Sequence, residues 1–373
     1  MNDNIVNRQS MPVGWKKLRS CNVFWYRRVS LVMETLEASH LCRKPWAISL
    51  ILLAFAASSV IAHAGPPPET SLSIAVAAQP AQPATNAADA AKLRRSSLAT
   101  DGKVKIVRDA VYGTVGEEKL KMDIFIPRDA TNRPLPVAVY VHGGGWEMGD
   151  KSRRGEAIAI PELVKRGYLV ASINYRLAPK YKFPAQIEDA KCAIRFLRAS
   201  AATYELDPMR IGVFGDSAGG HLVALLGLTD AKAGFEGTGG YPEQSSKVQA
   251  VVDMFGPTDL AGEFGNVETL RIAKSVFGAT NIQDAVIKSG SPVTYVNKGA
   301  PPFLILQGDK DRLVPLEQSQ ELHDRLTAAG SSSTLVIVKN AGHGFVPVGG
   351  QPQPSRLELS RMIADFFDKS LRK

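Results

Sequence analysis

The stretch Gly215–Gly220 reads GDSAGG and comes directly after the apolar run Arg210–Phe214. Glycine and serine are common between a strand and a helix, so the stretch can be an ordinary connection. Alternatively, Ser217 occupies a tight, strained strand-to-helix turn, because Gly215 and Gly219 leave room where larger side chains would collide. Its hydroxyl would then be exposed above a sheet. The choice between these interpretations depends on partner residues elsewhere in the chain.

The pattern around this stretch predicts alternating strands and helices. Leu135–Val141 (LPVAVYV) is a near-continuous apolar run, which is typical of a strand covered on both faces. Strands that alternate with helices predict an α/β fold with a mostly parallel sheet and helices on both faces. The other expected strands are Val104–Tyr112, Leu120–Ile126, Leu169–Tyr175, Ile211–Phe214, Gln249–Met254, Pro302–Leu306 and Thr334–Val338. The expected helices are about Glu156–Arg166, Gln186–Ser200 (with Ile187, Ala190, Ile194 and Leu197 on one face), Ala218–Leu228, Leu316–Ala329 and Leu357–Leu371 (burying Met362, Ile363, Phe366 and Phe367).

Candidate partners for Ser217 follow three of these strands. Chemistry in an open parallel sheet gathers at the carboxyl ends of the strands. Of the six histidines, His343 is the candidate base, because it lies between glycines on a loop at a strand end. The others are expected elsewhere: His40 and His63 in the N-terminal segment, His142 bracing the glycine-rich loop, His221 as a packing residue, and His323 inside a helix.

Two carboxylates on one loop compete for the role of the acid. Asp309 and Asp311 both follow the expected strand Pro302–Leu306. Asp311 lies further along the loop, immediately before the Leu-Val-Pro segment that begins the next helix, which favours it. Asp309 is expected to cap the turn.

The serine turn, the loop His142–Trp146 (HGGGW) and the order Ser217, Asp311, His343 resemble the α/β-hydrolase fold. More narrowly, over about residues 105–370 the chain is similar to carboxylesterases of the hormone-sensitive-lipase type and to bacterial feruloyl and acetyl-xylan esterases. The resemblance implies hydrolysis of carboxylic esters without a metal or an organic cofactor. It implies Ser217 as nucleophile, His343 as base and Asp311 as acid.

The resemblance also assigns the groups around these three residues. Gly144, Gly145 and Ala218 would donate backbone N–H groups to the developing oxyanion. Gln307 departs from the family pattern, since many relatives have histidine there. It lies outside the catalytic three, so we expect the departure to matter little. Trp146 and Asp216 border the site, and Trp146 either lines the substrate pocket or only packs beside it.

Two other functions stay open beside ester hydrolysis: cleavage of other acyl bonds, such as a formamide or a short peptide, and a non-catalytic binding scaffold. A scaffold would not need an intact triad, so the triad favours an enzyme. Little sequence remains for an N-terminal cap, and the insertion 256–300 is too short and too polar for a large apolar lid. We expect this insertion to shape one wall of the pocket, and the substrate to be a small-molecule or carbohydrate-linked ester of a short acyl or feruloyl group.

The N-terminal segment predicts export from the cytoplasm. An uncharged, largely apolar stretch, 45–64, follows Arg43 and Lys44 and ends in Ala-His-Ala, as in a signal peptide cleaved after Ala64. Signal peptides have about 15–30 residues, so we expect the true start at Met33. A signal anchor is the alternative, because the stretch approaches the roughly 20 residues that span a bilayer, and only then would the chain be held at a membrane. Both interpretations place the rest of the chain in the periplasm or the medium.

Composition bounds what the remainder can do. Residues 65–102, rich in Ala and Pro, predict a flexible tether, and 103–373 predict one catalytic domain. The formal net charge is +9, of which five charges belong to residues 1–64. The rest shows no basic stripe, which argues against nucleic-acid binding. Cys192 is the one cysteine after residue 64, and its apolar helical surroundings predict a packed core thiol.

Overall fold

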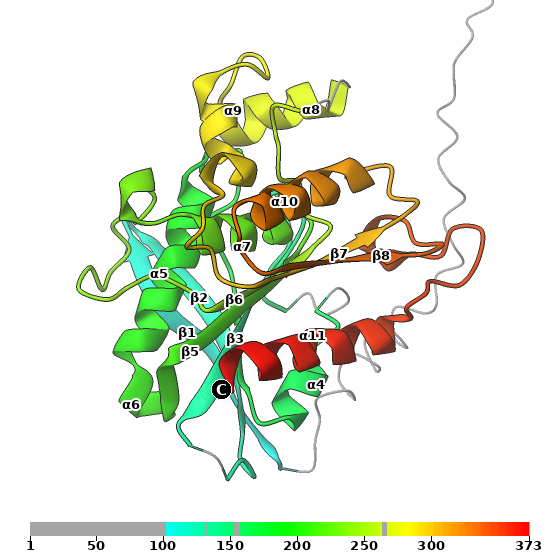
Figure 1. Cartoon of the computed structure of the whole chain (residues 1–373). Helices are drawn as coiled ribbons and strands as arrows, with labels where there is room; N and C mark the ends of the chain where they lie inside the picture. Colours follow the sequence, from blue (N-terminus) through cyan, green and yellow to red (C-terminus); the bar gives the residue numbers. More distant parts are fainter. Residues whose placement is uncertain (1–101, 132, 153–156, 263–266, 373) are drawn as a thin grey trace, which may run out of the picture. The chain divides into compact units, whose positions relative to one another are not determined.

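The computed structural model describes residues 102–131, 133–152, 157–262 and 267–372 (Figure 1). The predictions for residues 1–64, and for the tether up to residue 101, lie outside these ranges. The described residues form an eight-stranded sheet in the order β1-β2-β4-β3-β5-β6-β7-β8. Its strands are β1 Val104–Val115, β2 Glu118–Pro127, β3 Leu135–Val141, β4 Leu169–Ile173, β5 Leu206–Asp216, β6 Ala250–Met254, β7 Phe303–Gly308 and β8 Ser333–Val338.

The sheet is mostly parallel, as predicted. β2 pairs antiparallel with β1 and with β4, whereas every neighbouring pair from β4–β3 to β7–β8 is parallel. β3 lies in the middle and is buried at all seven residues. Its continuous apolar sequence is therefore explained by cover on both faces.

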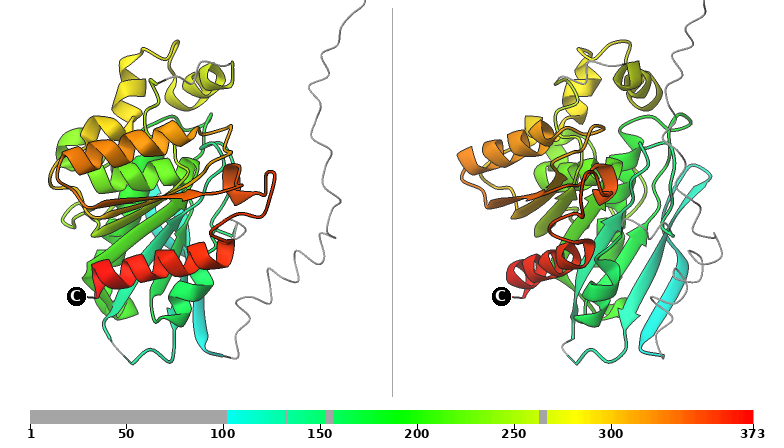
Figure 2. Two further views of the ribbon diagram at one scale, coloured as in Figure 1. Left: turned by 45° about the vertical axis from the view of Figure 1, so that its right-hand side comes forward. Right: turned by 90° about the vertical axis from the view of Figure 1, so that its right-hand side faces the viewer.

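Helices supply that cover on both faces of the sheet (Figure 2). One hydrophobic core includes residues of α5, α7 and α10, and a second, on the other face, includes residues of α4 and α11. The helices are α4 Ile160–Lys165, α5 Ala185–Ala199, α6 Ala201–Tyr204, α7 Ala218–Leu228, α8 Val267–Ile272, α9 Ala285–Gly290, α10 Leu316–Ala328 and α11 Arg356–Leu371, with short 3-10 or π turns η2 Ala231–Ala233, η3 Ala273–Phe277, η4 Pro292–Tyr295 and η5 His343–Phe345.

Local sequence signals explain where α11 and α4 begin and which face α5 buries. Ser355 and Glu358 form a capping box at α11, in which each side chain bonds to the other residue's backbone N–H. On α5, the predicted face of Ile187, Ala190, Ile194 and Leu197 is fully buried. α4 begins at Ile160, later than predicted, with Pro161 in its first turn, where a missing N–H does no harm.

The last helix buries a narrower stripe than predicted. On α11, Ile363 and Phe367 are fully buried, whereas Met362 and Phe366 are only partly buried. Residues four apart lie on one face of a helix, and this face points at the sheet.

The insertion between β6 and β7 forms α8, η3, α9 and η4. α8 and α9, drawn in yellow, lie at one end of the described fold, with α11 toward the other (Figures 1 and 2). Among the residues described, we find no helix with both the length and the apolar character required to cross a membrane.

Candidate active site

Ser217 joins the end of β5 to the start of α7 in an unusual backbone conformation. Its φ is 53° and its ψ is −119°. Such strain costs on the order of 1–3 kcal/mol and persists only where the surroundings enforce it. A Cβ at Gly219 would lie 2.1 Å from the Val141 carbonyl oxygen, and one at Gly215 would lie 2.5 Å from the Gly219 carbonyl oxygen. The predicted tight, strained turn between small residues is thus confirmed.

The structure brings Ser217, Asp311 and His343 together at this edge of the sheet. Nε2 of His343 lies 2.9 Å from Oγ of Ser217, and its Nδ1 lies 2.8 Å from Oδ2 of Asp311. The Asp311 side chain is fully buried, whereas that of His343 is 25% exposed. Because a carboxylate accepts the hydrogen of Nδ1, Nε2 is left to take a proton from the hydroxyl. The arrangement can therefore produce a nucleophilic serine.

Asp311, rather than Asp309, faces the histidine. Oδ1 of Asp311 also accepts the backbone N–H groups of Leu313 (2.9 Å) and Val314 (3.0 Å). Asp309 points toward lysines instead, with Oδ2 at 3.7 Å from Nζ of Lys339. The expectation that Asp309 caps the turn was wrong. Among the described residues its buried Oδ1 has no hydrogen-bond partner, and two backbone N–H groups of the loop donate to Asp311 instead.

Gln307 has a larger part in the site than we expected. It is buried on β7, and its Nε2 donates to Oδ2 of Asp311 (3.2 Å) and to the Val314 carbonyl (2.9 Å). Its Oε1 accepts a hydrogen bond from the Ser319 hydroxyl (2.9 Å). Gln307 lies outside the catalytic three, as predicted, but it contacts the acid. Its place four residues before Asp311 was the available signal.

Phe255 was not singled out from the sequence at all. It follows β6 directly, is buried, and sets its ring edge to face against His343, with 4.9 Å between the ring centroids. This contact covers one side of the imidazole and restricts its orientation.

The glycine-rich loop after β3 brings backbone N–H groups to the site. Gly144 and Gly145 have φ values of 120° and 60°. Both line the same cavity as Ser217 and Ala218. Within the described ranges, no hydrogen bond uses the N–H of Gly144, Gly145 or Ala218. Ala218 is also the first residue of α7, and the N-terminal end of a helix favours an anion.

Three aromatic side chains, those of His142, Tyr175 and Tyr140, hold the loop and the turn in place. Nδ1 of His142 donates to the Gly143 carbonyl (2.7 Å), which confirms the predicted brace. The His142 ring stacks on Tyr175, whose hydroxyl donates to the His142 carbonyl (2.9 Å). At the serine turn, Tyr140 donates a 2.5 Å hydrogen bond to Oδ1 of Asp216, the residue before Ser217.

A cavity of about 270 Å³ opens beside Ser217. Trp146 lines it and is only 4% exposed, so this residue both lines the pocket and packs. The insertion forms one wall, as predicted, and the side chains it turns inward are apolar apart from one arginine. They are Pro257, Leu260, Arg271, Ile272, Ala273, Phe277 and Ile287.

An ion pair joins the insertion to the glycine-rich loop at this cavity. Nη1 of Arg271 lies 3.0 Å and 2.7 Å from the two carboxylate oxygens of Glu147, and the Ser275 hydroxyl donates to the same carboxylate. Burial alone would raise the pKa of Glu147, but the hydrogen bonds from Ser275 and Arg271 lower it below its usual value. The insertion is therefore fastened to the loop by a charged group.

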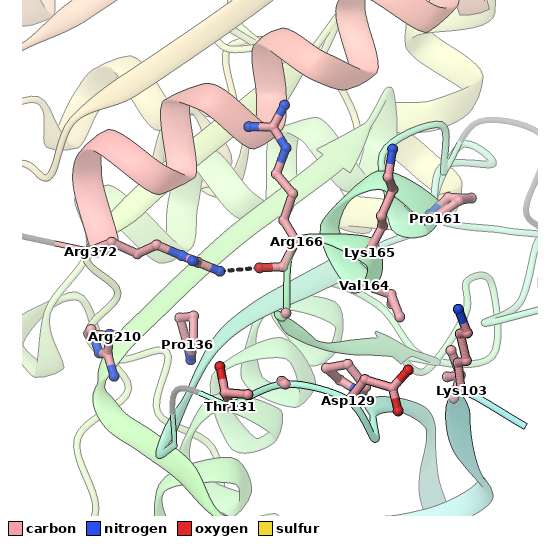
Figure 3. Close-up of a pocket in the computed structure, with 14 residues that line it drawn as sticks. Lys103, Asp129, Thr131, Pro136, Pro161, Val164, Lys165, Arg166, Arg210 and Arg372 are labelled. Atoms are coloured by element: carbon pink, nitrogen blue, oxygen red, sulfur yellow. Dashed lines mark hydrogen bonds between the residues drawn. The ribbon is translucent and has the colours of Figure 1, made fainter.

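A larger cavity, of about 670 Å³, lies elsewhere and none of the three candidate residues lines it (Figure 3). Arginines surround it, but their charges are matched by carboxylates of the fold. Arg166 pairs with Glu162, Asp365 and Asp368, Arg372 pairs with Asp368, and Arg210 pairs with Asp207. We therefore place the candidate site at the smaller cavity. In the part of the chain that is described, no cluster of three or more His, Cys, Asp or Glu side chains is arranged to hold a metal.

Comparison with known proteins identifies the family. The model of the BD-FAE family matches residues 122–326, more than half of the 373-residue chain. The chain belongs to the BD-FAE family. BD-FAE proteins are α/β-hydrolases, so the predicted fold and the resemblance to esterases are confirmed.

Curated relatives of this BD-FAE chain include two mycobacterial proteins. Esterase LipC of Mycobacterium tuberculosis is 33% identical over 248 residues, which cover 64% of this chain and 59% of LipC. The probable carboxylic ester hydrolase LipM of the same organism is 30% identical, over 78% of this chain and 71% of LipM. The chain thus spans less than two thirds of the length of LipC.

The similar solved structures are also esterases. A truncated carbohydrate esterase from gut microbiota has a TM-score of 0.63 and 28% identity, over 74% of this chain and 99% of that one. Esterase Est2 of Thermogutta terrifontis, with propionate bound, has a TM-score of 0.59 and 26% identity, over 72% of this chain and 94% of that one. The BD-FAE chain therefore resembles esterases across nearly the whole of these structures.

Proposed function

We propose that this BD-FAE chain hydrolyses carboxylic esters, with Ser217 as nucleophile, His343 as general base and Asp311 as the acid that orients it. The observation that carries the proposal is the hydrogen-bonded series from Ser217 through His343 to Asp311, with contacts of 2.9 Å and 2.8 Å, at an apolar cavity. The names of its relatives support esters over other acyl bonds.

The reaction proceeds in two halves. Oγ of Ser217 attacks the ester carbonyl carbon as its proton passes to Nε2 of His343, and the negative charge collects on the carbonyl oxygen. The N–H groups of Gly144, Gly145 and Ala218 stabilise this oxyanion. When the intermediate collapses, the alcohol leaves with the proton from His343 and the acyl group stays on Ser217. Water then attacks, giving its proton to His343, and the acid departs as Ser217 recovers its hydrogen.

The cavity favours a short acyl group. Its volume of about 270 Å³ falls below the roughly 300–1,000 Å³ of pockets that enclose a whole drug-sized ligand. We infer that the acyl part enters and the alcohol stays outside, where it can belong to a carbohydrate. A structural relative is named a carbohydrate esterase, and Est2 was solved with propionate and with butyrate. We propose acetyl to butyryl esters on the size of this cavity, and feruloyl esters on the resemblance to feruloyl esterases.

We also propose that the chain acts outside the cytoplasm, secreted or in the periplasm. The support is the apolar stretch at 45–64 and its Ala-His-Ala ending. An exported enzyme would meet polymeric or carbohydrate-linked esters that do not enter the cell.

A panel of p-nitrophenyl esters from acetyl to decanoyl, run beside methyl ferulate, acetylated xylan, N-formyl peptides and short peptides, tests the function. We expect turnover of the short-chain and feruloyl esters, and a decline toward decanoyl. Turnover of amides alone would contradict the ester assignment. Binding without turnover of any compound would make the chain a scaffold.

A further inference from the structure

His221 links three separate parts of the cavity. It lies on α7, four residues after Ser217, and is fully buried. Its Nδ1 lies 3.2 Å from Nε1 of Trp146, and its Nε2 lies 2.7 Å from the carbonyl oxygen of Gly290. Trp146 belongs to the glycine-rich loop, and Gly290 ends α9 of the insertion. One side chain on the nucleophile helix therefore bonds to both neighbouring walls.

The chemistry of the partners determines where the imidazole hydrogen lies. A carbonyl oxygen can only accept, so Nε2 donates to Gly290. An indole N–H can only donate, so Nδ1 accepts from Trp146. Both bonds are satisfied only by the neutral ring with its hydrogen on Nε2. Burial lowers the pKa of His221 to about 4, which keeps this neutral form at physiological pH.

Trp146 connects His221 to the groups proposed to react. It directly follows Gly145, lies at a positive φ of 60°, and lines the cavity with Ser217. Its ring packs edge to face on His221 (5.1 Å between centroids) and on Phe277 of the insertion (5.8 Å). Since a non-glycine residue at positive φ needs support from its surroundings, a hydrogen bond to the indole restrains both this wall and the backbone before it.

We propose that His221 is a positioning residue that fixes the Trp146 indole, and through it the glycine-rich loop and the cavity wall formed by the insertion. The inference rests on the proposed esterase function and extends it. It differs from the packing role predicted from the sequence, because a packing residue would act by volume alone. The two hydrogen bonds distinguish the roles.

Three variants of the full chain separate hydrogen bonding from volume. His221→Phe keeps a ring and removes both bonds, and His221→Asn keeps an acceptor near the position of Nδ1. Trp146→Phe removes the indole donor from the other side. Thermal unfolding of each variant establishes that it is folded before its kinetics are compared.

With p-nitrophenyl butyrate we expect His221→Phe to lower kcat about 10- to 100-fold with less than a threefold change in KM. His221→Asn should recover at least a third of the lost activity. Trp146→Phe should reproduce most of the loss seen in His221→Phe. The double variant should be no worse than His221→Phe, because the bond between these two side chains is absent from all three variants. A folded His221→Phe with unchanged kcat, or fully additive losses in the double variant, would overturn the proposal.

Fluorescence gives a readout that does not depend on catalysis. The emission of the chain minus that of Trp146→Phe isolates one of the four tryptophans. The same difference is taken for each His221 variant, with and without Trp146→Phe. We expect the Trp146 emission to be shifted in His221→Phe and restored in His221→Asn. If the spectrum shifts while Ser217→Ala retains esterase activity, the contact is supported and the proposed function fails. An unshifted spectrum overturns the positioning role, whatever the activity of Ser217→Ala.

Discussion

Nε2 of Gln307 donates a hydrogen bond to Oδ2 of Asp311, the same oxygen that faces Nδ1 of His343. Together with the two backbone N–H groups on Oδ1, this contact leaves the carboxylate little freedom to turn. The acid is thus held by its own loop and by β7, independently of the histidine. A carboxylate restrained in this way can orient the imidazole throughout a reaction cycle.

Replacing the proposed nucleophile should remove activity without loss of the fold. Ser217→Ala keeps the backbone and takes away only Oγ, so we expect kcat on p-nitrophenyl butyrate to fall by at least about 10³-fold. The melting temperature should change little. Ser360→Ala, at a buried serine on α11, serves as the matched control and should keep full activity. More than about a tenth of the original rate in Ser217→Ala would contradict the role of Ser217.

The two aspartates of the acid loop should differ sharply. Asp311→Asn allows the wrong imidazole tautomer, and in a serine protease the corresponding change lowers kcat roughly 10⁴-fold. Asp309→Asn changes only contacts with Lys310 and Lys339, so we expect less than a threefold effect. Steady-state kinetics of both variants at one pH make the comparison. The reverse ranking would transfer the role to Asp309.

Shortening one aromatic side chain of the cavity wall should change the acyl preference. Phe277 lines the cavity and is 5% exposed. Phe277→Leu opens space, so we expect the ratio of kcat/KM for octanoyl over butyryl ester to rise at least roughly tenfold. Phe235→Leu is the control, because Phe235 is equally buried but does not line the cavity. An equal change in both variants would point to general loosening instead.

A buried carboxyl beside the nucleophile turn should make stability depend on pH. Asp253 on β6 is fully buried, and Oδ1 accepts the N–H of Gly256 (2.9 Å). Burial raises its pKa to about 7, so the fold favours the protonated acid. The contribution of this acid to the free energy of unfolding is complete below about pH 4. It is lost as the pH rises through about 7, and the loss is up to roughly 4 kcal/mol.

Asp253→Asn should remove this dependence, because the amide stays neutral. We expect urea unfolding to show a loss of stability between pH 5 and pH 8 in the original chain, and a smaller loss in Asp253→Asn. Equal losses in the two proteins would mean that Asp253 is ionised in the fold at both pH values.

The proposed export can be checked on the mature chain. Protein recovered from outside the cytoplasm should begin at Gly65, as read by N-terminal sequencing. Ala64→Leu should block processing, since small residues precede a cleavage site. A chain that keeps residues 45–64 in the membrane fraction would instead favour the anchor.

Local pattern predicted most of the architecture. The apolar run of β3, the spacing on α5 and the punctuation around Ser217 each depend on neighbours in the sequence, and the structure agrees with all three. The partners Asp311 and His343 could be chosen because strand ends of a parallel sheet meet at one edge.

Relationships between distant segments could not be predicted in this way. The bond from Trp146 to His221 joins residues 75 positions apart, and no periodicity in either segment indicates it. The insertion was predicted to form a wall, but the apolar character of this wall was missed. The elements α8, η3 and α9 have only five or six residues each, too few for a helical pattern to emerge. Polar residues between these elements interrupt the apolar pattern in the sequence, so the side chains that line the cavity do not stand out.

The insertion between β6 and β7 is a separate segment of the chain from the proposed reacting groups. The proposed reacting groups come from the ends of β5, β7 and β8, whereas one wall of the cavity comes from the insertion. The insertion contacts His221 through a main-chain carbonyl, which every residue type provides. Exchanging this segment should therefore change which acids the proposed hydrolytic centre accepts, provided that the replacement also supplies partners for the Glu147 carboxylate.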